Sequence, residues 1–184
     1  MSAARKPTAR RTASARRGVH APKQAAPRPV DVVVITVSDT RRGAEDTSGA
    51  LAERLLVRAG CVVSKRAWVR DDVAAIRRAL RAALARRSVD VVVLTGGTGV
   101  APRDVTPEAV EPLLERPLPG FGEGFRARSW ATIGSAAWLS RAGAGVARGR
   151  LVVYLPGSNG AVREALEGML IPELVHVVRL LGRF

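Results

Sequence analysis

The sequence has little of two residue types on which many functional sites depend. Among its 184 residues it holds one cysteine, Cys61, and two histidines, His20 and His176. A single cysteine excludes a disulfide framework and any zinc site built from several cysteines. Two histidines exclude His-rich metal sites and most His-based catalytic triads. We therefore expect Cys61 to be a small buried hydrophobe and His176 to have a structural role.

Long apolar runs are also missing. No run approaches the roughly 18–20 residues that a membrane span needs. The paired arginines near the N-terminus are not followed by the apolar segment of an export signal. Four prolines within the first 29 residues would break the amphipathic helix of a mitochondrial transit peptide. The sequence therefore predicts a cytoplasmic protein without membrane contact.

Acidic residues are absent from the first 29 positions. This segment has eight of the 30 basic residues, which leaves 22 basic and all 16 acidic residues for positions 30–184. Of the formal net charge of +14, eight units thus belong to residues 1–29 and six to the rest. The Arg-, Pro- and Ala-rich composition predicts a disordered basic tail over 1–29 and one domain over 30–184. A solubilising role for the tail is favoured over the alternative, a nucleic-acid contact through phosphates.

Buried strands alternate with amphipathic helices in the remainder of the chain. The continuous β-branched run of residues 30–37 is typical of a strand buried on both faces. Further strands are predicted at 61–69, 89–94 and 151–155. Helices are predicted at 48–59, 71–87, from 106 onward, 120–130, 135–141, 159–170 and 172–181, with Thr106 as the cap of the third. This alternation predicts an α/β fold, a three-layer α/β/α sandwich around a mostly parallel sheet.

Three of the predicted strands run into polar loops. Because carboxyl ends of parallel strands meet at one edge of a sheet, these loops should gather there. The loop after the third strand, Thr95-Gly96-Gly97-Thr98-Gly99, brings backbone N–H groups and threonine hydroxyls to an anion, and a phosphate-bearing ligand fits it. The alternative is a tight turn without a ligand. The loop matches neither the Walker A nor the dinucleotide-binding pattern.

Two carboxylates accompany these loops. Asp104 lies five residues after Gly99, where a carboxylate would repel a phosphate unless a divalent cation lay between them, so we expect it to be a magnesium ligand. Asp46 follows the first strand and is the second candidate. The alternatives are helix capping for Asp46, and pairing with Arg103 or capping for Asp104. Two carboxylates at one phosphate site suit metal-assisted phosphoryl or nucleotidyl transfer.

Arginines and tryptophans have competing interpretations. Arg126 and Arg141 could clamp an anionic ligand, although any single arginine of so basic a chain is more often a solvated surface charge. Trp68, Trp130 and Trp138 are predicted as core or subunit-contact residues rather than a base-stacking platform.

Several motifs together resemble the MogA/MoaB family of molybdenum cofactor biosynthesis proteins, closer to the MoaB branch. The resemblance covers about residues 30–180. Its motifs are Thr36-Val37-Ser38-Asp39, Glu45-Asp46-Thr47-Ser48-Gly49, Thr95-Gly96-Gly97-Thr98-Gly99, Arg103-Asp104-Val105-Thr106-Pro107-Glu108-Ala109, Pro119-Gly120-Phe121-Gly122-Glu123, Leu139-Ser140-Arg141 and Leu155-Pro156-Gly157-Ser158.

This resemblance implies a molybdopterin site and, in active members, adenylylation of molybdopterin by ATP with Mg²⁺. It also implies a homo-oligomer, a trimer or hexamer, with other cofactor-biosynthesis proteins as possible partners. Asp46 and Asp104 match the family's acidic positions and are the expected catalytic and Mg²⁺-binding residues. A catalytically inactive pterin-binding or partner-binding paralogue is the alternative. The expected substrate- and nucleotide-binding residues are Ser38, Asp39, Thr95, Gly96, Gly97, Thr98, Gly99, Thr106, Pro107, Glu108, Glu123, Arg126, Ser140, Arg141, Pro156, Gly157 and Ser158.

Overall fold

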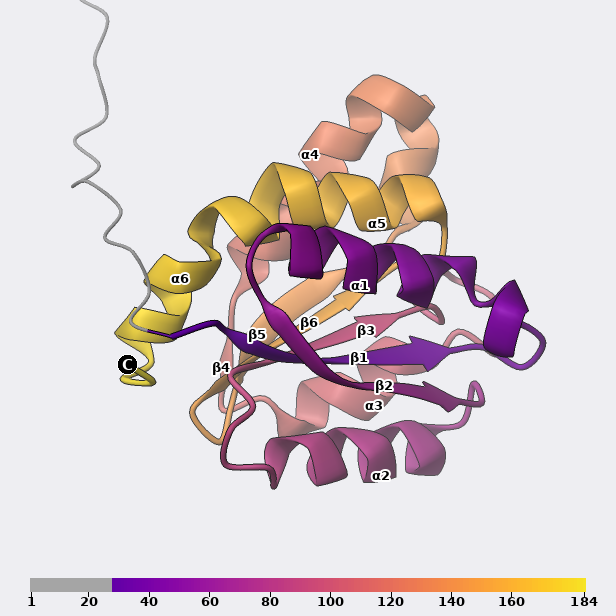
Figure 1. Cartoon of the computed structure of the whole chain (residues 1–184). Helices are drawn as coiled ribbons and strands as arrows, with labels where there is room; N and C mark the ends of the chain where they lie inside the picture. Colours follow the sequence, from indigo (N-terminus) through magenta and orange to yellow (C-terminus); the bar gives the residue numbers. More distant parts are fainter. Residues whose placement is uncertain (1–27) are drawn as a thin grey trace, which may run out of the picture.

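A six-stranded sheet forms the centre of the molecule in a computed structural model that describes residues 28–184 (Figure 1). The strands are β1 (Asp31–Val37), β2 (Val62–Val69), β3 (Val91–Thr95), β4 (Arg116–Pro117), β5 (Gly143–Ala147) and β6 (Arg150–Leu155), in the order β2-β1-β3-β6-β5-β4. The first four of these in space are parallel, whereas β5 runs antiparallel to both β6 and β4. The predicted mostly parallel α/β sheet is confirmed.

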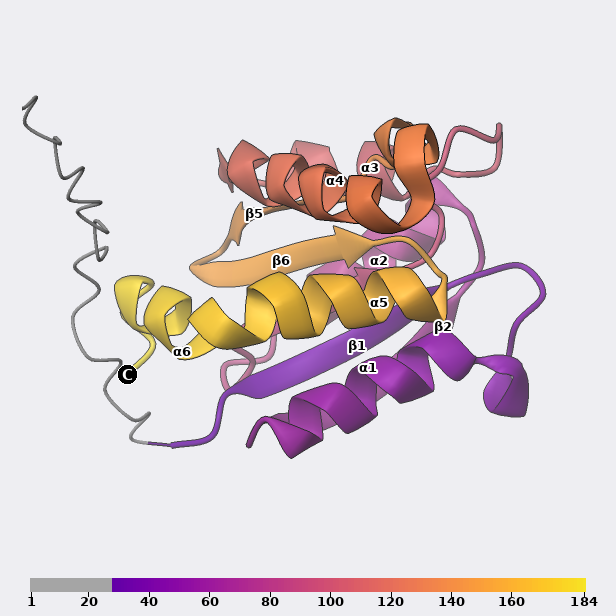
Figure 2. The same cartoon turned by 90° about the horizontal axis from the view of Figure 1, so that it is seen from above.

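Helices cover both faces of the sheet. They are α1 (Thr47–Arg58), α2 (Val73–Leu84), α3 (Thr106–Val110), α4 (Pro119–Ile133), α5 (Asn159–Ala165) and α6 (Ile171–Leu180), with short 3-10 turns η1 (Gly43–Glu45), η2 (Glu111–Leu113) and η3 (Gly134–Leu139) and a π turn η4 (Leu166–Leu170). Seen from above, α1, α5 with α6, and α4 lie across one face, whereas α2 and α3 lie beneath the sheet (Figures 1 and 2). The sandwich therefore has the three layers that the sequence predicts.

The central strands separate two hydrophobic cores. All residues of β1 and β3 are buried. Val32 and Val34 belong to the core under α1, α5 and α6, and Val33 and Ile35 belong to the core over α2 and α3. Side chains of a strand alternate between faces, so an unbroken β-branched run fills both cores at once. The prediction of a strand buried on both faces is confirmed.

Strands β4 and β5 were not predicted. The sequence of β5, Gly-Ala-Gly-Val-Ala, has little β propensity. The turn into β6 has positive φ at Arg148 (51°) and Gly149 (68°), which suits a tight hairpin. Tertiary pairing with β6, rather than local preference, therefore forms this part of the sheet.

Several predicted helix ends also differ. The predicted helix at 135–141 is the 3-10 helix η3, and the helices predicted at 159–170 and 172–181 are joined through η4 into one helical stretch. Thr106 does not cap α3. The cap position is Val105, and the Thr106 hydroxyl instead donates to the carbonyl oxygen of Gly96 at 2.8 Å.

The boundary of the predicted tail differs by two residues. Residues 1–27, on which the prediction of disorder falls, lie outside the described residues. Arg28 belongs to the folded domain, because its guanidinium donates two hydrogen bonds, of 2.7 and 2.8 Å, to the carboxylate of Asp90. Over residues 28–184, no helix has the length and apolar character that crossing a membrane would require.

The cysteine and two of the tryptophans test the predictions of burial. Cys61 is buried, as predicted, and burial raises the pKa of its thiol to about 11. Trp130 and Trp138 are not core residues, since they are 56% and 65% exposed on the segment formed by α4 and η3. Tryptophan is a large apolar residue, but a core position needs neighbours on all sides, and this segment projects from the body of the molecule (Figure 1).

Candidate functional site

The glycine-rich loop lies where the carboxyl ends of β1, β3 and β6 meet. The N–H of Gly96 donates to the carbonyl oxygen of Leu155 at 2.9 Å. A Cβ atom on Gly96 would lie 2.0 Å from the carbonyl oxygen of Val37, and its φ of +107° is one that side-chain-bearing residues rarely adopt. Gly157 is also packed closely, since its Cβ would lie 3.2 Å from the Cα of Gly96. The three polar loops are therefore in contact, as the sequence predicts.

The threonine hydroxyls of this loop region serve different purposes. Thr95 donates to the carbonyl oxygen of Pro156 at 3.2 Å, and Thr106 donates to that of Gly96. Both therefore hold the loop in place. Thr98 is 2% exposed, and its hydroxyl has no hydrogen-bond partner within residues 28–184. Because a buried hydroxyl is costly without a partner, Thr98 is the threonine best suited to receive a ligand.

A small acidic pocket of about 220 Å³ adjoins the loop. Gly97 lines it together with three carboxylates, those of Asp39, Asp71 and Asp104. Asp39 accepts a hydrogen bond from the backbone N–H of Asp71 at 3.3 Å, and Asp104 accepts one from that of Ala101 at 2.9 Å. Burial, then the charges of Asp39 and Asp104, raise the pKa of Asp71 above its usual value. Arg41 and Arg103 also line the pocket, so its carboxylates exceed its positive charges by one, an excess that a cation would relieve.

Asp71 is the functional candidate that the sequence interpretation missed. The sequence predicts that either Asp71 or Asp72 caps the following helix. In the structure Asp72 is the cap, since it accepts a hydrogen bond from the N–H of Ala75 at 2.7 Å. Only one residue of the pair can hold the cap position, which leaves Asp71 at the carboxyl end of β2, where it faces the acidic pocket. The doubled aspartate after a strand is the signal that could have identified it.

Asp46 lies outside this pocket. It is 6% exposed and caps α1 by accepting a hydrogen bond from the N–H of Gly49 at 2.8 Å. Its carboxylate also accepts from the hydroxyl of Thr36 at 2.9 Å and pairs with Arg66 at 2.8 Å. The structure thus brings Asp104, but not Asp46, to the acidic pocket. Among the described residues, no three His, Cys, Asp or Glu side chains are placed so as to form a metal site.

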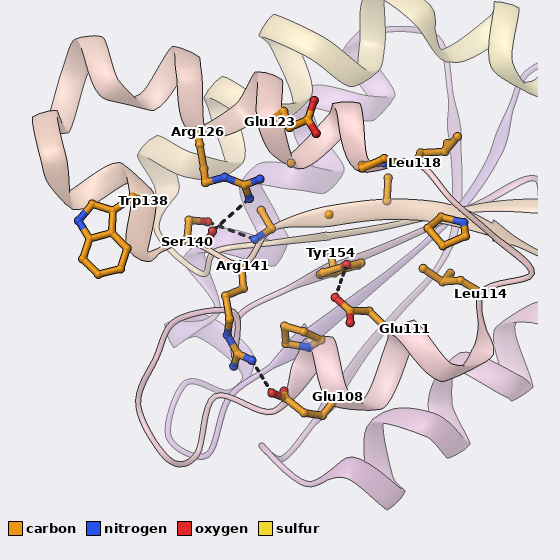
Figure 3. A pocket seen from close by; sticks show the side chains of 17 residues that line it. Glu108, Glu111, Leu114, Leu118, Glu123, Arg126, Trp138, Ser140, Arg141 and Tyr154 are labelled. Atoms are coloured by element: carbon orange, nitrogen blue, oxygen red, sulfur yellow. Dashed lines mark hydrogen bonds and ion pairs between the residues drawn. The ribbon is translucent and has the colours of Figure 1, made fainter.

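A larger cavity of about 650 Å³, which we call the Arg126 pocket, lies between α3, α4 and the β5–β6 hairpin (Figure 3). Arg141, which lies between η3 and β5, reaches the glycine loop, where its Nε donates to the carbonyl oxygen of Gly99 at 2.8 Å, and it pairs with Glu108. This pairing holds the pKa of Glu108 below its usual value. Arg126 donates to the carbonyl oxygen of Ser140 at 3.3 Å. The pocket therefore holds two guanidinium groups, which can bind an anion, together with the carboxylates of Glu108, Glu111 and Glu123.

A second cavity, of about 760 Å³, lies between α4 and α5, and we call it the α4–α5 cavity. Thr98, whose buried hydroxyl is unpartnered within the described residues, lines it, and Phe125 and Ile133 contribute apolar walls. Ser140 lines both this cavity and the Arg126 pocket. Because Gly99 lines the α4–α5 cavity and also accepts the Arg141 hydrogen bond, the two cavities adjoin at the end of the glycine loop.

The predicted site residues are distributed over these three spaces. Ser38, Asp39, Gly97 and Asp104 line the acidic pocket. Pro107, Glu108, Glu123, Arg126, Ser140 and Arg141 line the Arg126 pocket. Thr98, Gly99, Ser140, Pro156 and Ser158 line the α4–α5 cavity. The remaining residues hold the loops together through hydrogen bonds and close packing: Thr95, Gly96, Thr106 and Gly157.

A glycine loop and adjoining pockets at the carboxyl edge of a mainly parallel sheet define a small-molecule-binding α/β protein. The chain belongs to the family described as "Probable molybdopterin binding domain", which matches residues 33–176.

Relatives and solved structures share nearly the whole domain. The chain is 49% identical over 158 residues to the molybdenum cofactor biosynthesis protein B of Bacillus subtilis (strain 168), a match covering 85% of this chain and 93% of the relative. A crystal structure of a molybdenum cofactor biosynthesis protein B has a TM-score of 0.83 at 44% identity, covering 87% of this chain and all of the other. The tungsten cofactor synthesizing protein MoaB of Pyrococcus furiosus has a TM-score of 0.72 at 38% identity, over 84% and 98% of the two chains.

Proposed function

We propose that this chain takes part in molybdenum cofactor biosynthesis in the cytoplasm and adenylylates molybdopterin with MgATP, releasing pyrophosphate. The family match and the names of the relatives support the pathway and the pterin ligand. The observation that carries the reaction is the position of the glycine loop, whose Gly97 lines the acidic pocket while Thr98 and Gly99 line the α4–α5 cavity. Two phosphate-bearing ligands can meet at such a shared wall.

The reaction needs positioning and charge compensation more than it needs a protein nucleophile. A terminal phosphate oxygen of molybdopterin attacks the α-phosphorus of ATP and forms a new P–O bond. The bond from the α-phosphorus to the oxygen that bridges it to the β-phosphorus breaks, and pyrophosphate leaves with the electron pair. In this proposal, backbone N–H groups of Gly97–Gly99 and the hydroxyl of Thr98 hold phosphate oxygens, and Arg141 and Arg126, which line the adjoining pocket, balance their charge.

The acidic pocket fits the magnesium ion that accompanies ATP. Mg²⁺ is usually held by one or two carboxylates together with substrate phosphates and water, rather than by a closed protein cage. Asp71 and Asp104, with Asp39 beside them, offer such carboxylates next to the glycine loop, and burial, then the charges of Asp39 and Asp104, raise the pKa of Asp71. When bound, the ion would neutralise phosphate charge. We therefore assign the metal-binding role to Asp71 and Asp104, in place of Asp46.

A homo-oligomer, a trimer or hexamer, accompanies this proposal. Trp130, Ile133 and Trp138 are each more than half exposed, and all three lie on α4 and η3. Exposed apolar residues gathered on one projecting segment are typical of a subunit contact. Analytical ultracentrifugation of the Trp138→Ser variant, compared with the wild type, tests this contact.

Asp104→Asn is the decisive variant for the reaction. We expect at least a hundredfold loss of pyrophosphate release from molybdopterin and MgATP, because the substitution removes charge from the proposed metal site; effects of this order, about 10²–10³, follow loss of one electrostatic group at a reacting centre. Asp72→Asn is the matched control, since Asp72 caps α2 outside the pocket and asparagine caps equally well. Circular dichroism melting checks that both variants fold.

Asp46→Asn separates the two assignments of the metal ligand. We expect it to keep most of the transfer activity but to unfold more easily, since it loses the charge that pairs with Arg66. Full activity of Asp104→Asn would refute the adenylylation mechanism. Wild-type protein that binds molybdopterin but releases no pyrophosphate would instead support the alternative, a catalytically inactive pterin-binding paralogue.

A further inference from the structure

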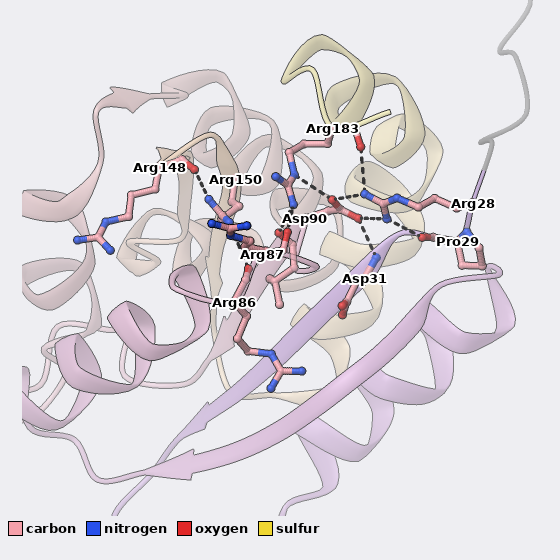
Figure 4. A network of polar contacts seen from close by, with 10 residues as sticks. Arg28, Pro29, Asp31, Arg86, Arg87, Asp90, Arg148, Arg150 and Arg183 are labelled. Atoms are coloured by element: carbon pink, nitrogen blue, oxygen red, sulfur yellow. Dashed lines mark hydrogen bonds and ion pairs between the residues drawn. The ribbon is translucent and has the colours of Figure 1, made fainter.

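The edge of the sheet opposite the pockets carries a cluster of arginines. Its members come from the amino ends of the central strands and from the C-terminus: Arg28, Arg86, Arg87, Arg148, Arg150 and Arg183 (Figure 4). We call this set the arginine pole. Three carboxylates accompany it, those of Asp31, Asp90 and Glu115, so six positive charges face three negative ones.

A buried carboxylate organises part of the pole. Asp90 is fully buried and pairs with Arg28 at 2.7 Å and with Arg183 at 3.1 Å. Burial alone would raise the pKa of Asp90, but hydrogen bonds from Arg28, the backbone N–H of Asp31 and Arg183 hold it below its usual value. Two of the six arginines are thereby held in place and share the negative charge of one carboxylate.

The other arginines of the pole keep uncompensated charge. Arg150 donates to the carbonyl oxygens of Arg148 and Arg86, and its Nε is buried without a hydrogen-bond partner in the part of the chain described. Burial, then repulsion from Arg183, lower the pKa of Arg150. The side chains of Arg86 and Arg148 are exposed and point away from the network in Figure 4, and Arg87 is exposed as well.

The sequence carries further basic charge before Arg28. Residues 1–27 contain seven basic residues and no acidic one, and the chain joins the domain at Arg28, inside the pole. The pole and this segment together account for ten of the fourteen units of net charge. The substrates of the proposed reaction do not explain this excess, because the pockets lie at the opposite edge of the sheet and include carboxylates of their own.

We propose that the arginine pole binds the phosphate backbone of double-stranded nucleic acid, without sequence preference. Arginine matches phosphate with a planar fork of donors, and dense positive charge is sufficient for backbone binding. A protein partner fits less well, because the exposed side chains of the pole are guanidinium groups whereas cores of protein interfaces are depleted of charge.

The test uses the full-length chain and a short fluorescein-labelled DNA duplex of mixed sequence, followed by fluorescence anisotropy from about 50 to 200 mM salt. The variant Arg86→Ala/Arg87→Ala/Arg148→Ala removes three exposed charges from the pole. The control Arg54→Ala/Arg70→Ala/Arg78→Ala removes the same charge from exposed positions elsewhere. We expect the pole variant to bind at least about tenfold more weakly and to reduce the slope of log K against log salt by about 3, with little change in the control.

Three outcomes would overturn the proposal. The wild type could show no salt-dependent binding. Both triple variants could lose affinity equally, which would make net charge, not the pole, responsible. Poly-glutamate could displace the duplex at equal charge concentration, which would identify an acidic protein as the better partner. None of these readouts depends on adenylyl transfer, so failure of this proposal would leave the proposed function unaffected.

Discussion

The two edges of the sheet differ in whether their carboxylates are paired with positively charged groups. At the amino edge, Asp90 is buried but compensated by two arginines and a backbone N–H, so the fold itself satisfies it. At the carboxyl edge, Asp39, Asp71 and Asp104 lie together around a pocket, and burial, then the charges of Asp39 and Asp104, raise the pKa of Asp71. A compensated carboxylate stabilises a fold, whereas a repulsive cluster costs stability and is typical of a ligand site.

Asp90→Ala should have one of the two largest effects on stability. We expect a loss of about 3 kcal/mol in the free energy of unfolding, because the substitution leaves Arg28 and Arg183 without their shared partner. Urea denaturation measures it. Asp104→Asn is the contrasting variant at the other edge, and it should change stability by less than about 0.5 kcal/mol. Equal losses in the two variants would remove the contrast between the edges.

The contribution of Asp90 should also depend on pH in a defined direction. Its pKa is lowered in the folded state, so the folded protein binds fewer protons than the unfolded chain below about pH 4. The contribution is therefore fully present at neutral pH and is lost as the pH falls through the folded-state pKa. Acid unfolding of Asp90→Asn, compared with the wild type, should show a shallower pH dependence in that range.

Gly96→Ala tests whether the backbone of the glycine loop at the carboxyl edge tolerates a side chain. The added Cβ would lie 2.0 Å from a backbone oxygen at a φ of +107°, so we expect a loss of roughly 3 kcal/mol or a displaced loop with weakened ligand binding. Gly160→Ala is the matched control, since nothing lies within 4 Å of its added Cβ and its φ is not in the left-handed region. Thermal melting and binding of ATP measure both, and a neutral Gly96→Ala would contradict the geometry of the loop.

Asp71→Asn should have the smallest and most informative effect on stability. Because burial and the charges of Asp39 and Asp104 raise the pKa of Asp71, removing its charge should stabilise the fold slightly at neutral pH. The same change should lower adenylyl transfer if Asp71 helps to hold Mg²⁺. A gain in melting temperature with a loss of activity would sharpen the comparison of the edges, whereas a destabilised variant would show that Asp71 is a structural residue.

The sequence determined the central part of this molecule. β-branched runs such as residues 30–37 can be buried on both faces only in a sheet covered on each side by helices, so the sandwich and the edge where its polar loops meet were predictable. The position of the glycine loop was predictable for the same reason, since it follows directly from the end of β3, and Asp104 lies further along the same connection to α3. The motifs also pointed to the family that residues 33–176 match.

Only the tertiary structure decided which carboxylates share a pocket. Asp46 and Asp71 both follow strands and both precede helices, so local sequence could not separate them. Arg66, 20 residues away, compensates Asp46, whereas Asp39 and Asp104 approach Asp71 from other strands. Pairing with β6 likewise formed β5 from a segment of low β propensity. Local pattern fixes which residues form strands and helices, but the partner of each charge depends on contacts between residues distant in the chain.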